Sequence, residues 1–342
     1  MNSFYLLIFI PLIFLLSYII AKYINLYDHP DNKRKIHSQP ILIVGGIFFQ
    51  SIILVYFLIF LILNEKNDLS HFLNNQKDLL VLLSTVFLSF IVGLFDDKKN
   101  LNPFLKLILM FLIFSISLFF LSDIYSIRRL KSFFDFNIYF DTYYIFFTAL
   151  CFVILLNATN MSDGINSLTS NIFIIWIFFI TLFLPNNNFY YFMNIVLIIS
   201  LVLFSIVNYR NKCFLGDSGC FVLVCYLSFV TVYVYNKHLL ISEKNYLNLE
   251  SIFLLFLIPG IDMLRLFLKR IYMGKNPLKA DKNHFHHKLL GNFGNFKALI
   301  IYNLMILIPW LVYLLSRSML PYIIIIVLVI YYIMIVKIKK TI

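Results

Sequence analysis

The stretch that decides the fold runs from residue 143 to residue 164 and reads YYIFFTALCFVILLNATNMSDG. Its first part, Tyr143 to Leu156, carries no charge and has most of the length needed to cross the hydrocarbon core of a bilayer. Asn157, Asn160 and Asp163 then follow at intervals of three residues, so on a helix they lie along one broad face. Two amides and a carboxylate where a span meets water predict a site for a metal ion or a phosphate.

The composition extends this interpretation to the whole chain of 342 residues. Hydrophobic residues make up 61% of it and charged residues only 13%, against about 25% charged residues in a soluble domain. The chain is therefore predicted to be an all-α, polytopic membrane protein. The net charge of +12 is scattered over short loops, which membrane topology explains better than nucleic-acid binding. The four cysteines form no CxxC pair and are interpreted as small core residues.

Eleven apolar runs are long enough to span a bilayer, some of them marginally. They lie at about Phe4–Leu26, Ile41–Leu63, Leu79–Phe95, Phe104–Ser122, Thr142–Asn157, Ile165–Pro185, Phe189–Val207, Gly219–Tyr235, Ser251–Leu268, Ala298–Ser316 and Met319–Val336. We expect one integral-membrane domain over residues 1–342, with its two ends on opposite sides of the membrane. The first run has neither a basic stretch before it nor an A-x-A site after it, which favours a retained span over a cleaved signal peptide.

The basic residues set the orientation. Twenty of the 28 lysines and arginines fall in one set of loops, and the positive-inside rule puts that set in the cytoplasm, with the N-terminus outside and the C-terminus cytoplasmic. The three glutamates all fall outside. Eight aspartates lie at the cytoplasmic face: Asp28, Asp31, Asp96, Asp97, Asp163, Asp217, Asp262 and Asp281. Short carboxylates among cations at helix ends indicate a metal ion and an anionic substrate.

The first two cytoplasmic loops carry polar clusters. Arg34 and Lys35, followed by His37, can hold a phosphate, and a lipid-headgroup anchor remains the alternative. Asp96 and Asp97 end a span, and their mutual repulsion raises the pKa of one of them, which suits it to hold or take a proton. The same pair suits Mg²⁺, a hard ion that prefers carboxylate oxygens. An ordinary charged helix end is the alternative for this pair.

Two later loops complete the set. In the segment Phe214 to Gly219, glycines on both sides of Asp217 let an ion approach the carboxylate closely, although a helix-capping turn has the same composition. In the segment Asp281 to His287, one continuous helix would place Asp281, His284 and His287 on a shared face and point His286 away. A zinc site there lacks a fourth ligand, so anion contact by the imidazoles is expected.

A further carboxylate lies upstream of the histidines. Asp262 and Arg265 stand three residues apart after Pro259-Gly260. A carboxylate at the centre of a membrane helix costs roughly 2.5–3.5 kcal/mol, so Asp262 is expected to be paired or near the interface. The spacing predicts an ion pair between these two residues.

In this order, the motifs resemble the polyprenyl-phosphate N-acetylhexosamine-1-phosphate transferases, glycosyltransferase family 4. The match covers roughly Asp28 to Leu290. It runs through D-x-P…R-K-x-H from Asp28, G-x-x-D-D from Gly93, N-A-x-N-x-x-D-G from Asn157, F-x-G-D-x-G from Phe214 and D-x-x-H-x-H-H from Asp281. The last form is similar to the branch that starts O-antigen, common-antigen and teichoic-acid lipids, and favours the undecaprenyl-phosphate GlcNAc-1-phosphate transferases.

Three positions depart from the family pattern. Asn166-Ser167 stands where a second D-G is common, Leu42-Ile43-Val44 precedes the glycine pair at 45–46, and Met110 replaces a frequent glutamine. Asn166 can still hydrogen-bond a uracil edge, but it cannot serve as a carboxylate. The metal-binding aspartates of the pattern are intact.

The resemblance implies an enzyme of the inner (cytoplasmic) membrane that transfers HexNAc-1-phosphate from a UDP-sugar to undecaprenyl phosphate and releases UMP. The active site would face the cytoplasm, and the cofactor would be Mg²⁺, with Mn²⁺ as the alternative ion. Asp217 would be the main metal ligand with Asp97 and Asp163, and Asp96 and Asp97 would orient or deprotonate the lipid phosphate. The implied substrate-binding residues are Arg34, Lys35, His37, Asn157, Asn160, Asn166, Phe214, His284, His286 and His287.

Two other functions stay open at this point. Within the enzyme class, the runner-up is the phospho-MurNAc-pentapeptide transferase of peptidoglycan synthesis. From another class, a transporter or lipid scramblase should place ionisable groups near the bilayer midplane on broken helices, whereas here they gather at span ends. The partners expected are the bilayer, the lipid acceptor and the UDP-sugar, without nucleic acid; a homodimer is left open, as are the donor sugar and a phospho-enzyme step.

Overall fold

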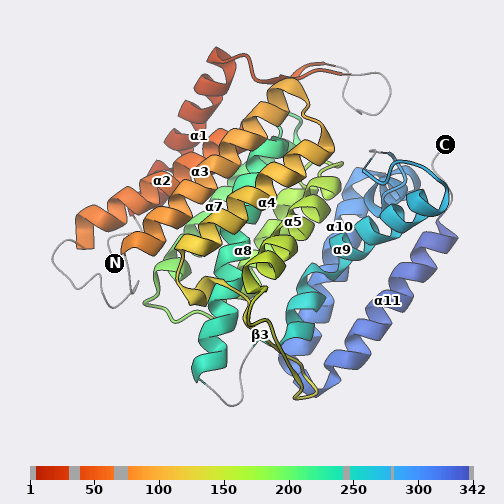
Figure 1. The fold of residues 1–342 in the computed structure, drawn as a ribbon. Helices are drawn as coiled ribbons and strands as arrows, with labels where there is room; N and C mark the ends of the chain where they lie inside the picture. The colour runs from red at the N-terminus through yellow and green to blue at the C-terminus, as the bar shows by residue number, and fades with distance from the viewer. Residues whose placement is uncertain (1–4, 31–38, 65–75, 242–246, 279–280, 339–342) are drawn as a thin grey trace.

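The computed structural model describes residues 5–30, 39–64, 76–241, 247–278 and 281–338, and the described chain forms one bundle of helices (Figure 1). This confirms the predicted all-α architecture. Arg34, Lys35 and His37 lie outside the described residues. The eleven helices are α1 Tyr5–Tyr23, α2 Gly45–Asn64, α3 Gln76–Lys99, α4 Pro103–Phe120, α5 Tyr144–Ser162, α6 Leu168–Thr181, α7 Phe189–Tyr209, α8 Gly216–Ile241, α9 Leu249–Tyr272, α10 Phe285–Leu315 and α11 Leu320–Lys337.

The helices have the length and composition of membrane spans. Within the described residues, nine are long and apolar enough to cross a membrane, and α2 and α6 carry shorter apolar stretches. Large apolar side chains stay exposed on the outer helices, for example Ile8 on α1 and Ile325 on α11. A bilayer is the solvent in which such faces are stable. The chain is therefore a multi-pass membrane protein, as predicted.

Helix α8 forms the centre of the bundle (Figure 1). Its residues from Ser218 to Tyr235 are all buried inside the protein, whereas α4 and α11 bury only 22% of their apolar stretches and line the periphery. Helices α2, α3 and α5 pack around α8. Close packing at its start depends on glycine: a side chain added at Gly93 of α3 would come within 3 Å of the Ser218 backbone, and Gly45 and Gly46 of α2 meet α8 and the residue before it as closely.

A short β-structure fixes where α8 begins. Strand β1 (Tyr27–Asp28) pairs antiparallel with β2 (Ile41–Leu42), and the next residue, Ile43, forms a parallel bridge to Phe214. The Phe214 N–H donates to the Leu42 carbonyl at 2.8 Å. These bonds tie the chain before α8 to the chain before α2. A second hairpin, β3 (Arg129–Lys131) with β4 (Asn137–Tyr139), lies at the opposite end of the bundle (Figure 1).

Helix α10 corrects one prediction. A loop was expected up to Lys297, before a span starting near Ala298, but the helix begins at Phe285, after His284 as its N-cap residue. Gly294 interrupts it with φ 76° and ψ 169°, values that glycine adopts readily. The residues before Gly294 are not uniformly apolar, so the search for apolar runs missed this first helical stretch. The break separates it from the membrane span that follows.

Candidate functional site

Asp97, in the last turn of α3, caps the start of α8. Its Oδ1 accepts the N–H of Asp217 at 2.7 Å, and its Oδ2 accepts the N–H and the hydroxyl of Ser218 at 3.1 and 2.5 Å. Gly216, with φ 73°, lets the chain turn into the helix directly against this carboxylate. Unpaired N–H groups at a helix start favour an anionic partner. Asp97 therefore fixes the position of Asp217.

The capping role makes a stability prediction. Asp97→Ala removes the acceptor of two backbone N–H groups and a hydroxyl, and is expected to lower the free energy of unfolding by about 1–3 kcal/mol. The measurement is thermal unfolding of detergent-purified protein. Asp123→Ala is the control, because Asp123 is exposed and its ion pair with Arg128 lies on the surface. An Asp97→Ala protein that melts together with the wild type would contradict the capping role.

Asp96 and Asp217 share one cation. Lys106 Nζ lies 2.6 Å from Asp96 Oδ2 and 3.4 Å from Asp217 Oδ2. The Leu101 N–H donates to the other oxygen of Asp96 at 2.7 Å, and Asp96 is only 4% exposed. We call Asp96, Asp97 and Asp217 the aspartate cluster. Asp217 keeps 27% of its side chain exposed, and its carboxylate oxygens are not held by backbone N–H groups, unlike those of Asp97. The lysine offsets their repulsion.

The Asn157 to Gly164 motif ends α5 beside this cluster. Helix α5 stops at Ser162, and Asp163 follows as its C-cap residue. Part of the surface of Asp163 is exposed, but its carboxyl group is surrounded by protein atoms. This loss of hydration raises the pKa of the carboxyl group to about 7, and the negative charge of Asp97 raises it further. Asn157 contacts the Met263 sulfur at 3.3 Å on α9. The end of α5 thus lies against α9, and Asp163 after it is close enough to Asp97 of α3 to respond to its charge.

Gly164 brings this motif to the histidines. A side chain added at Gly164 would meet the rings of His286 and His287 within 3 Å, so only glycine allows the approach. The ring centroids of His284 and His286 are 5.4 Å apart and nearly parallel, and those of His286 and His287 are 4.2 Å apart. We call these three residues the histidine row. His286 is 1% exposed, so the prediction that it points away is wrong.

The reason is that residues 281–287 do not form one helix. Asp281 precedes α10 and accepts the Asn283 N–H at 2.7 Å and Arg270 Nε at 3.1 Å. Burial would raise the pKa of the Asp281 carboxyl, but the hydrogen bonds from Asn283 and Arg270 outweigh it and lower that pKa. Asp281 therefore stabilises the loop between α9 and α10, and does not share a helical face with His284.

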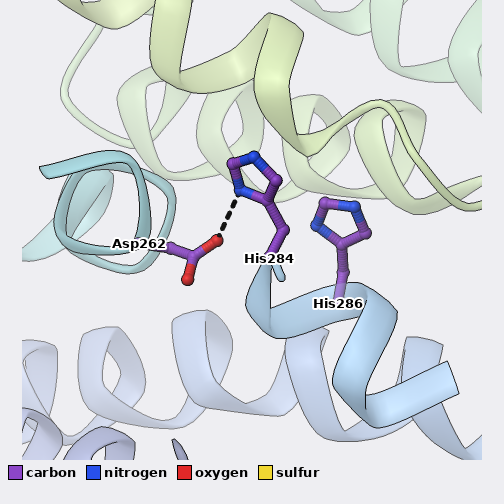
Figure 2. Close-up of side chains that lie close together, drawn as sticks. All are labelled: Asp262, His284 and His286. Atoms are coloured by element: carbon purple, nitrogen blue, oxygen red, sulfur yellow. Dashed lines mark hydrogen bonds and ion pairs between the residues drawn. The ribbon is translucent and has the colours of Figure 1, made fainter. Parts of the chain in front are cut away.

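Asp262 of α9 is the main site residue for which the sequence predicted only one of several partners. The predicted ion pair with Arg265 is confirmed at 2.7 Å, but Asp262 also accepts from the Tyr331 hydroxyl at 2.7 Å and from His284 Nδ1 at 2.9 Å (Figure 2). The only signal in the sequence was a carboxylate inside an apolar span. Its partner Tyr331 lies 69 residues away on α11, and no spacing rule connects the two.

Other predicted residues have their own contacts. Asn166 donates to the side chain of Asn211 after α7, and Phe214 is half-buried beside the β2 bridge. Among the described residues, only Asp262, His284 and His286 form a trio with ligand atoms within 4.8 Å of one another. Asp97, Asp163 and Asp217 do not form so tight a group, and their role as metal ligands stays a prediction.

Comparison with known proteins agrees with this geometry. Residues 79–235 match the family model described as glycosyl transferase family 4, which spans α3 to α8 and includes the whole aspartate cluster. An undecaprenyl-phosphate alpha-N-acetylglucosaminyl 1-phosphate transferase of Thermotoga maritima is 26% identical over 287 residues, which cover 83% of this chain and 79% of the relative. The family match includes the motifs that begin at Gly93, Asn157 and Phe214. Over residues 79–235 the chain is similar to glycosyl transferase family 4, and over most of its length it is similar to the Thermotoga relative.

Proposed function

We propose that the protein transfers HexNAc-1-phosphate, with GlcNAc-1-phosphate as the first choice, from a UDP-sugar to undecaprenyl phosphate and releases UMP. The observation that carries the proposal is the convergence of distant motifs at one end of the bundle. Asp97 bonds the backbone of Asp217, and Gly164 lies against His286 and His287. The Thermotoga relative, whose name describes such a transfer, supports the choice of acceptor and sugar.

The residues present suit a magnesium ion. Asp96 and Asp217 approach the same Lys106 ammonium, so their oxygens converge on a position that already attracts a cation. Carboxylate oxygens are hard ligands of the kind that Mg²⁺ prefers, and Mn²⁺ accepts them too. We assign Asp217 as the main ligand, with Asp163 from the end of α5. Bound at a diphosphate, the ion supplies charge neutralisation of the leaving group and alignment of the attacking oxygen.

The protein groups themselves position the substrates. Asp97 keeps Asp217 at the start of α8, and Lys106 neutralises part of the charge on Asp96 and Asp217. The histidine row offers ring nitrogens for the phosphates or the sugar, and it lies against Gly164, which ends the motif that contains Asn157 and Asn160. Phosphoryl transfer depends mainly on such positioning and on charge stabilisation.

We further propose that this end of the bundle faces the cytoplasm in an inner membrane. The basic residues favour that orientation through the positive-inside rule. It lets a water-soluble nucleotide sugar meet a lipid acceptor at the membrane surface. The product would be the first lipid-linked sugar of a cell-surface polysaccharide.

The test is UMP release by detergent-purified protein given undecaprenyl phosphate, Mg²⁺ and each UDP-HexNAc in separate reactions. We expect release with at least one donor, dependent on both the lipid and the metal, and the fastest donor identifies the sugar. Release only with UDP-MurNAc-pentapeptide would instead support the peptidoglycan transferase. No release with any donor, from protein that melts cooperatively, would refute the transferase proposal and favour transport.

A further inference from the structure

The carboxylate of Asp262 is held on every side by hydrogen-bond donors. Arg265 and the Tyr331 hydroxyl donate to Oδ1 at 2.7 Å each, His284 Nδ1 donates to Oδ2 at 2.9 Å, and the Phe285 N–H lies 3.1 Å from Oδ2. Asp262 is 4% exposed. The donors come from α9, α10 and α11, so one buried carboxylate joins three helices.

The bond to His284 sets the chemistry of its ring. An ionised carboxylate paired with Arg265 only accepts hydrogen bonds, so Nδ1 of His284 must carry a proton. In the neutral ring this leaves Nε2 as the acceptor, on the edge of the imidazole away from Asp262. Figure 2 shows the ring of His284 held from one side by Asp262 and beside the ring of His286.

We propose that Asp262 is a positioning residue for sugar-phosphate transfer: held by Arg265 and Tyr331, it fixes the tautomer and the ring orientation of His284. Through the stacked rings it also aligns the histidine row against Gly164. The structural half of this proposal stands by itself, and its consequence for catalysis rests on the proposed function. Partners that orient a metal-ligating histidine in this way typically contribute 10- to 100-fold, and we expect a loss of the same order for the oriented ring of His284.

A metal ion is the competing occupant of the same cluster, because ligand atoms of Asp262, His284 and His286 lie within 4.8 Å of one another. Both ring nitrogens of His286 are buried without a partner, which would suit a ligand. However, the Arg265 guanidinium already pairs with the carboxylate, and a dication would have to displace the Nδ1 proton of His284. The observed bonds favour the positioning role, and metal binding becomes an outcome of the test.

The first measurement needs no activity. Protein labelled with ¹⁵N at histidine is examined by ring ¹H–¹⁵N correlation spectra, with the His284 signals identified by their loss in His284→Gln. We expect His284 in the Nδ1-protonated form, and a changed tautomer or loss of a single form in Asp262→Asn. A neutral His284 protonated at Nε2 in the wild type would overturn the proposal. So would Zn²⁺ that copurifies with the protein and is lost in His286→Asn.

The second measurement links the residue to catalysis. Asp262→Asn is expected to lower kcat about 10- to 100-fold, but to change it less than about threefold when His284 is already Gln, because the two residues act as a unit. A merely structural role would give the same loss in both backgrounds and would overturn the proposal. Asp78→Asn is the matched control. Asp78 is also buried and accepts the Ser122 N–H at 2.9 Å, but it lies in the first turn of α3, at the end of this helix opposite to Asp97.

The two failures are distinguishable. A wild type that releases no UMP refutes the proposed function, while the histidine spectra still decide whether Asp262 fixes the ring. Tyr331→Phe covers the case in which Asp262→Asn does not fold, because it removes one donor to Asp262 and leaves the bond to His284. We expect this variant to keep the Nδ1-protonated form and to lose less than about tenfold in kcat. Loss of the Nδ1-protonated form in Tyr331→Phe would mean that Tyr331, and not Asp262, determines the tautomer of His284, and would overturn the proposal.

Discussion

Asp217→Asn is expected to lower the rate of sugar-phosphate transfer by about 10³-fold while the protein stays folded. The asparagine keeps the backbone N–H that donates to Asp97, so the start of α8 is preserved. It loses the charge that would hold a metal ion at a partly exposed carboxylate whose oxygens are not held by the backbone. Metal stabilisation of a phosphoryl group is worth several kcal/mol, which corresponds to this loss in rate.

The measurement is initial UMP release at saturating Mg²⁺, together with thermal unfolding of the same preparation. Asp123→Asn is the matched control, because this exposed aspartate pairs with Arg128 away from the site. The control is expected to retain wild-type activity. An Asp217→Asn protein that retains more than a tenth of the wild-type rate would remove Asp217 from the metal site.

Gly93→Ala is expected to damage both stability and activity. The added methyl group would come within 3 Å of the Ser218 backbone, and a helix backbone at the centre of a bundle cannot move aside as a flexible side chain can. Overpacking of this kind costs about 1–3 kcal/mol. Gly93 also lies one helical turn before Asp97, so a displaced α3 would pull the cap away from α8.

Melting temperature and UMP release together check this expectation, and we expect both to fall. Gly260→Ala is the control: it lies inside α9, where an added methyl group meets nothing within 4 Å. Alanine is the better helix former, so this variant is expected to melt at or above the wild-type temperature. If Gly93→Ala melts like Gly260→Ala, the close approach of α3 and α8 is not a constraint.

Most of the fold could be predicted from the sequence because a bilayer imposes length and composition on each span. Each of the eleven α-helices of the described residues corresponds to one of the eleven predicted apolar runs. The first part of α10 was missed because it is not an apolar run, and the break at Gly294 hides its continuity with the span. Helix order along the chain also says nothing about which helix is buried, so the central place of α8 had to come from packing.

The site was predictable in its residues but, apart from the ion pair between Asp262 and Arg265, not in their partners. The motifs of the chain identified Asp96, Asp97 and Asp217. They did not predict that both carboxylate oxygens of Asp97 accept hydrogen bonds from the start of α8. The direction of His286 was predicted from one uninterrupted helix, and the loop at Asp281 removes that assumption. Contacts between distant segments, such as Asp262 with Tyr331, leave no local pattern to detect.

The burial of α8 has a consequence for how the protein meets its surroundings. The part of α8 from Ser218 to Tyr235 is enclosed by the rest of the bundle, so a bilayer would contact the outer helices and not this stretch. Stretching or thinning of the bilayer therefore acts first on α1, α4 and α11, and it can reach the aspartates through Lys106, the α4 residue that pairs with Asp96 and Asp217. One peripheral helix thus connects the membrane directly to the aspartate cluster, whereas most of α8 and the glycines packed against its start are shielded by their neighbours.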